Sequence, residues 1–223
     1  MLPDYLYENF YTASQLQAAS ETSAADLQGW QAAACMPMPS YSLQMDLHCL
    51  SYFGEHRDSG RLDFYAKGYV QWLQFLRTLP QSGLPEQQAG TAFRQRYLAR
   101  SLMLFEQGLW PRKFRSQDGK PDFTVLDQHI GREWVSFLKG TYGLCTKSGL
   151  PEDIADKELA TLVIDEITER QAKPALSASE EADLIMALRL LDRAAALFAP
   201  HERARSSRQR CIVAVAGKYG LAW

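Results

Sequence analysis

Apolar residues recur at intervals of three and four through most of the chain, the spacing of one face of an α-helix. The pattern is clearest in Leu184, Leu188, Leu191, Ala195 and Phe198. Prolines and capping residues mark helix ends, because proline is tolerated in a first turn but not in a helix interior. We therefore expect five main helices: about Leu62–Leu79, ended by Pro80; Pro85–Gln107; Leu126–Leu138; one that begins at Pro151; and one capped by Ser177 or Ser179.

Two polar, glycine-bearing segments, residues 110–122 and 140–149, are expected to be connections between these helices. The tail from Arg208 to Tyr219 is ambiguous, because its centre holds Ile212, Val213 and Val215, which suit a strand. A strand needs a partner, and the pattern indicates none elsewhere. We therefore predict a terminal helix and an all-α fold.

Two short helices are expected near the N-terminus, where Thr12 and Ser23 can cap them. The sequence runs Tyr11-Thr12, Leu16, Ala19, Ser23, Leu27 and Trp30, followed by Pro37 and Pro39. This spacing resembles the helix-turn-helix that opens the MerR-type regulators. The resemblance implies a helix-turn-helix-like module in residues 1–42, packed on a larger α-helical body of several helices in residues 43–223.

The charge distribution changes what this module is expected to do. The whole chain carries 24 Lys and Arg against 26 Asp and Glu. Residues 1–56 nevertheless hold six acids and no Lys or Arg. Residues 57–150 have a net charge of +6, residues 151–199 of −6, and residues 200–223 of +4. Since basic contacts to phosphate supply most non-specific DNA affinity, we do not expect DNA binding through residues 1–56. A structural or protein-binding role for the module is the favoured interpretation.

Several short motifs together resemble a bacterial family of uncharacterised proteins about 200 residues long. The motifs are Asn9-Phe10-Tyr11-Thr12, Pro39-Ser40-Tyr41, Tyr52-Phe53-Gly54, Gly140-Thr-Tyr-Gly-Leu-Cys145, Phe198-Ala-Pro-His-Glu-Arg203 and Ser206-Ser207-Arg208. This resemblance spans nearly the full chain and implies no activity.

The densest polar cluster lies between Pro200 and Arg210, before the predicted terminal helix. Arginine forks beside the free amides of a helix start form an anion site. The candidate ligands for an anion are His201, Arg203, Arg205, Ser206, Ser207 and Arg208. The alternative is structural: the acidic residues 151–199 pair with these arginines and hold the tail in place. We predict a non-catalytic binding or regulatory protein that recognises an anionic small molecule or a protein partner through this cluster.

Two alternatives stay open. One is a degenerate MerR-like DNA-binding regulator. The other is an enzyme that uses Cys145 as nucleophile, or a metal held by His129 and Glu133 at i, i+4 on one helix. A buried thiol and a helix-surface pair are the favoured interpretations of those residues, so we predict no cofactor and no metal.

The ends and the aromatic residues complete the prediction. The N-terminus lacks a secretory signal, no apolar run is long enough to span a bilayer, and the four cysteines are scattered. We expect a cytoplasmic protein with mostly buried, reduced thiols. Trp72, Trp110 and Trp134 are expected in the core, and a ligand pocket would first be sought between them and Tyr41, Tyr52 and Phe53.

Overall fold

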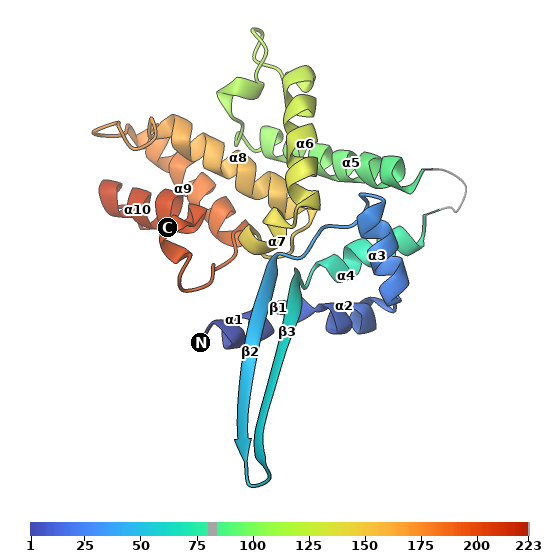
Figure 1. Cartoon of the computed structure of the whole chain (residues 1–223). Coiled ribbons are helices and arrows are strands. Elements are labelled where there is room, and N and C mark those ends of the chain that lie inside the picture. The colour runs from blue at the N-terminus through green and yellow to red at the C-terminus, as the bar shows by residue number, and fades with distance from the viewer. Residues whose placement is uncertain (80–83, 223) are drawn as a thin grey trace.

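Helices make up most of the protein, as the spacing predicts, but strands are present as well. The computed structural model describes residues 1–79 and 84–222, and Figure 1 shows how the elements are arranged. The N-terminal elements are α1 (Leu2–Asn9), β1 (Phe10–Thr12), α2 (Ala13–Ser20), α3 (Ala24–Ala32), β2 (Tyr41–Ser51), β3 (Gly54–Ala66) and α4 (Tyr69–Arg77). The C-terminal α-helices are α5 (Pro85–Glu106), α6 (Phe123–Leu138), α7 (Thr141–Cys145), α8 (Pro151–Ile167), α9 (Ala178–Ala194) and α10 (Ala214–Tyr219).

The prediction of an all-α fold is wrong, because three strands form an antiparallel sheet in the order β1-β3-β2. β2 and β3 pair without interruption from Tyr41 opposite Phe64 to Ser51 opposite Gly54. β1 pairs only with the last three residues of β3. The rest of the hairpin therefore projects from the protein as a two-stranded ribbon (Figure 1). We call residues 42–63 the arm.

The hairpin also explains why the predicted helix Leu62–Leu79 starts too early. Residues 62–66 continue β3, and the helix α4 begins only at Tyr69. The helical spacing of Tyr69, Leu73 and Leu76 is real, and all three side chains are buried. The predicted stop at Pro80 lies outside the described residues.

The N-terminal caps form as predicted. Thr12 Oγ1 accepts a hydrogen bond from the Gln15 amide at 3.3 Å, and Ser23 Oγ accepts one from the Asp26 amide at 3.0 Å. Between the two helices, Glu21 turns the chain with a φ of 55°. Two short capped helices thus precede the hairpin, and the division at residue 42 stays a prediction.

The C-terminal helices agree closely with the sequence pattern. Pro85 and Pro151 occupy first turns, and the Ser177 side chain caps α9 by accepting from the Glu180 amide. α9 ends at Ala194, earlier than the apolar stripe predicts, and Ala195 instead forms a bridge to Thr146. The tail is helical, as predicted, with a π-helix at Arg208–Val213 followed by α10.

Two apolar clusters hold these elements together. The larger cluster contains Trp72 and Trp110, which are buried as predicted, with Trp134 partly buried against it. The smaller cluster joins distant parts of the chain, since it combines Tyr5, Leu6, Phe10, Phe64 and Ala199. The base of the arm is therefore packed between α1 and a C-terminal segment. No helix in the described residues is long and apolar enough to cross a membrane.

Candidate functional site

The predicted anion cluster is divided between the surface and the interior. His201, Arg203 and Arg205 are exposed. Ser206 is buried and its hydroxyl is already used, because it donates to the Arg203 carbonyl at 2.7 Å and accepts from the Gln209 amide at 3.0 Å. The hydroxyl of Ser207 is buried and has no hydrogen-bond partner among the described residues.

Arginines next to this turn are paired with the acidic segment, as the structural alternative predicts. Arg208 forms an ion pair with Asp192 on α9, and Arg210 forms one with Asp165 on α8 at 2.7 Å. Glu202 lies inside the cluster and accepts a hydrogen bond from the Tyr41 hydroxyl at 2.6 Å. This carboxylate lowers the positive field that an anion would meet. Anion binding by His201, Arg203, Arg205, Ser206, Ser207 and Arg208 stays a prediction.

A second candidate, His129 with Glu133, is part of a buried polar network that joins α5, α6 and α7. His129 Nε2 lies 3.2 Å from the Tyr97 hydroxyl, and His129 Nδ1 lies 3.3 Å from Glu133 Oε1. The Tyr142 hydroxyl donates to the other carboxylate oxygen of Glu133. Each of these groups thus finds its partner inside the network.

Burial sets the protonation of this network. Desolvation, with the nearby positive charge of Lys113, lowers the pKa of His129 to about 4, so the ring is neutral at pH 7. Desolvation also raises the pKa of Glu133. Burial alone would raise the pKa of Glu158, but the ammonium of Lys157, 2.7 Å away, holds it below the usual value. The network is therefore suited to fixing α6 and α7 in place.

Neither form of the enzymatic alternative gains support from these contacts. No group of three or more His, Cys, Asp or Glu side chains that could hold a metal occurs among residues 1–79 and 84–222, so His129 and Glu133 lack a third ligand there. Cys145 is buried, and burial raises the pKa of its thiol to about 11, away from the low value that a nucleophile needs.

The arm is the feature that the sequence prediction missed. Its turn holds Tyr52 and Phe53, whose exposed fractions are 96% and 95%. Leu47 and Leu50 on β2 are exposed as well. This tip lies at the end of the hairpin far from the helices (Figure 1), so Tyr52 and Phe53 line no pocket with Trp72 on α4 or Trp134 on α6.

β2 carries an apolar row of side chains on one face of the arm, and β3 adds His56 and Asp58 to that same face. Side chains alternate between faces along a strand, which places Leu43, Met45, Leu47 and Cys49 on one face and Ser42, Gln44, Asp46, His48 and Leu50 on the other. Near the body, Leu43 and Leu62 pack against the smaller apolar cluster, but beyond Met45 the side chains of the β2 row are exposed. The apolar row of β2 therefore continues outward past the part that the body covers.

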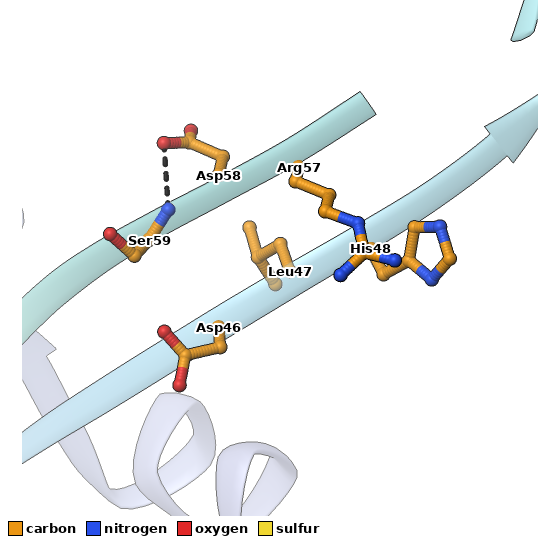
Figure 2. Close-up of a pocket in the computed structure, with 6 residues that line it drawn as sticks. All are labelled: Asp46, Leu47, His48, Arg57, Asp58 and Ser59. Atoms are coloured by element: carbon orange, nitrogen blue, oxygen red, sulfur yellow. Dashed lines mark hydrogen bonds between the residues drawn. The ribbon is translucent and has the colours of Figure 1, made fainter. Parts of the chain in front are cut away.

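A shallow hollow of about 520 Å³ lies midway along the arm. Figure 2 shows the residues that line it, with Asp46, Leu47 and His48 on β2 and Arg57, Asp58 and Ser59 on β3. Asp58 accepts a hydrogen bond from the Ser59 amide at 2.8 Å. The lining combines the carboxylates of Asp46 and Asp58 with the guanidinium of Arg57. The hollow therefore does not carry charge of a single sign.

The C-terminal helices carry the similarity to known proteins. A family model described as a family of unknown function, DUF6058, matches residues 89–220, which is more than half of the chain. The chain belongs to this family. Residues 1–88, with the arm, lie outside the part that the DUF6058 model matches. No curated protein and no solved structure matches the chain.

Proposed function

We propose that this DUF6058 protein is a non-catalytic binding protein that docks on a protein surface through its arm. The observation that carries the proposal is the apolar row of β2, which runs from Leu43 at the small core outward to the exposed Leu47, together with the exposed Tyr52 and Phe53 at the turn. Exposed apolar surface that is concentrated in this way is typical of interaction sites.

The form of the arm adds to the argument. A two-stranded hairpin alone is marginally stable in water, and this one presents edges without a described partner strand over most of its length. A protein that covers the apolar row of β2 would supply the burial that the isolated ribbon lacks. Free aromatic side chains at the tip, Tyr52 and Phe53, are the kind of residue that anchors protein interfaces.

Charge favours a protein over a nucleic acid as the partner. The arm carries four acids, Asp46, Glu55, Asp58 and Asp63, against Arg57 and Arg61. The α2–α3 pair that resembles a MerR-type helix-turn-helix adds no Lys or Arg. We therefore propose that the α2–α3 pair contacts protein and does not bind DNA. Anion recognition by the C-terminal cluster is the weaker proposal, because Arg208 and Arg210 already pair with acids.

Photo-crosslinking from the tip tests the proposal. A photoreactive phenylalanine analogue replaces Phe53, and the same analogue at Met186, an exposed position on α9, serves as the control. We expect a protein adduct from position 53 and none from position 186. The adduct counts only if the identified partner, once purified, binds the wild-type protein and not a Tyr52→Ser/Phe53→Ser variant. Adducts with lipid alone, or no adduct, would refute arm-mediated protein binding.

A further inference from the structure

We propose that the protein on which the arm docks is a second copy of this chain, paired through β2 in an antiparallel arrangement with its two-fold axis at Leu47. The inference rests on the proposed function, because it names the partner of the same arm. Three properties of β2 lead to it: a free edge, an apolar side-chain row, and a self-complementary order of residues.

The free edge comes from the sheet order. β2 is the outermost strand, and no described strand pairs with its far side. In an antiparallel ladder every second residue turns its amide and carbonyl away from its partner strand. Counting from the two-residue turn at 52–53, these are the even-numbered residues of β2, such as Asp46 and His48. Such an edge is a template for another strand.

The composition of the two strands selects β2 over β3. From Leu43 to Leu50, β2 contains Leu43, Met45, Leu47, Cys49 and Leu50. Residues 54–61 of β3 read Gly-Glu-His-Arg-Asp-Ser-Gly-Arg and contain no apolar side chain. Glycine and aspartate are depleted in strands. An added strand would therefore bury apolar surface along β2 and almost none along β3.

The register follows from the order of side chains along β2. With the two-fold axis at Leu47, Asp46 lies opposite His48 of the second copy, and the reverse pair forms across the axis. On the other face Leu47 meets its own copy, and Met45 lies opposite Cys49. Moving the axis to residue 46 sets Asp46 against itself, and moving it to residue 48 sets His48 against itself. Two carboxylates directly opposite each other destabilise a ladder, and an axis at residue 48 would set Met45 against Ser51 and Asp46 against Leu50, so Leu47 is the favoured centre.

This register also places the aromatic tips. Tyr52 of the second copy falls opposite Ser42, and Phe53 falls beside Tyr41. The Tyr41 ring already packs edge-on against Tyr5 and Phe10 at the base of the arm. Each exposed tip would thus reach the apolar base of the other arm, where the body ends.

Disulfide trapping tests the register directly. The native Cys49 is exposed, whereas Cys35, Cys145 and Cys211 are buried and do not compete. A Met45→Cys variant brings residue 45 opposite Cys49 in a pair that is not hydrogen-bonded, whose Cα separation of roughly 4.5 Å suits a disulfide. Mild oxidation, in which each pair of thiols loses two protons and two electrons to the added oxidant, should give a dimer linked 45–49.

Matched variants make the trapping specific. Met45→Cys/Cys49→Ser should give no linked dimer, and neither should the wild type, because residues with the same number are far apart except at Leu47. A wild-type 49–49 link as fast as the 45–49 link would overturn the register. Mass spectrometry of the linked peptides identifies which bond forms.

A charge exchange tests the same arrangement without oxidation. His48→Asp sets two carboxylates opposite each other twice per dimer, and we expect the dimer dissociation constant in sedimentation velocity to rise about tenfold or more. The exchange Asp46→His/His48→Asp again sets one carboxylate opposite one imidazole and should return the dissociation constant to within about threefold of the wild type. Circular dichroism confirms that each variant is folded.

The two proposals fail in different ways. A wild-type protein that stays monomeric to roughly 100 μM, with no 45–49 link, overturns pairing with a second copy. In that case a crosslink from Phe53 to a different protein would still support the proposed function. The absence of any protein crosslink from Phe53 overturns the proposed function as well.

Discussion

Two arginine–carboxylate ion pairs join α5 to α8 within the part of the chain that the DUF6058 family model matches. Arg96 binds both carboxylate oxygens of Glu152, at 2.7 and 2.8 Å, and Arg100 binds both of Asp156, at 2.5 and 2.9 Å. The pairs lie four residues apart on each helix and have the same geometry. They differ in burial, since the side chains of Arg100 and Asp156 are 18% and 7% exposed, against 31% and 42% for Arg96 and Glu152.

Burial should make the inner pair much more costly to break. Asp156→Asn leaves the Arg100 charge without its partner in a mostly desolvated place, which costs about 3 kcal/mol or more of unfolding free energy. For a protein of this length that corresponds to a fall in Tm of about 6–12 °C. The matched change Glu152→Gln breaks a half-exposed pair and should cost under about 1 kcal/mol.

Chemical and thermal denaturation followed by circular dichroism at pH 7 measures both variants. A double variant, Arg100→Met/Asp156→Leu, removes both inner charges and should recover most of the loss, because no buried charge is left unpaired. Equal costs for Asp156→Asn and Glu152→Gln would show that burial does not control these pairs. A double variant no better than Asp156→Asn would show that the loss comes from packing instead.

Three further predictions follow from the burial and backbone geometry described above. Native protein should react with a thiol reagent at one site, Cys49, and at four sites after denaturation; a second fast site in the native state would contradict the burial. Because the folded pKa of His129 is about 4 against 6.5 for a free ring, the unfolded state binds a proton that the folded state does not, and stability falls as the pH drops from 6.5 towards 4. Urea titrations measure the free energy of unfolding, which should fall between pH 7 and pH 5 by about 2 kcal/mol less in His129→Gln than in the wild type. An unchanged pH dependence would show that other groups cause the fall. Gly149→Ala should cost about 2–5 kcal/mol, because φ is +74° and the new Cβ would lie 2.5 Å from Tyr69 Cε1, whereas Gly119→Ala, at φ +81° in open space, should cost only about 1–2 kcal/mol; equal losses would exclude the clash as the cause.

The helical body could be predicted because its signals are local. Pro85, Pro151 and Ser177 begin helices by fixing φ or by capping a free amide, and each acts within one turn. The apolar spacing then identifies the buried face. The end of α9 was predicted too late, because Ala195 pairs with Thr146 from a distant segment, and a long-range contact leaves no mark in the spacing.

The arm was missed although part of its signal is present. Residues 41–49 alternate strictly between larger apolar or aromatic side chains and Ser, Gln, Asp and His, which is the period of a half-buried strand. The partner strand lacks this alternation, because residues 54–61 are polar on both faces. An amphipathic strand and a polar strand pair only in the register that the turn between them sets. This register cannot be predicted from the pattern of either strand alone.

The anion cluster shows a different limit of sequence reasoning. The composition shows that arginines are concentrated near Ser206, and the net charges of the segments suggest that the acidic residues 151–199 neutralise them. Which arginine pairs with which acid depends on how the tail crosses α8 and α9. The structure pairs Arg208 with Asp192 and Arg210 with Asp165, and leaves Arg205 at the surface.

The small core at the base of the arm has a consequence for synthesis on the ribosome. It needs Tyr5, Leu6, Phe10 and Phe64 from the start of the chain and Ala199 from near its end. At about 5–20 residues per second, translation takes roughly 7–27 s to proceed from Phe64 to Ala199. For that interval the apolar side chains of the nascent N-terminal segment lack their last covering segment. They are therefore a natural place for a chaperone to bind before the chain is released.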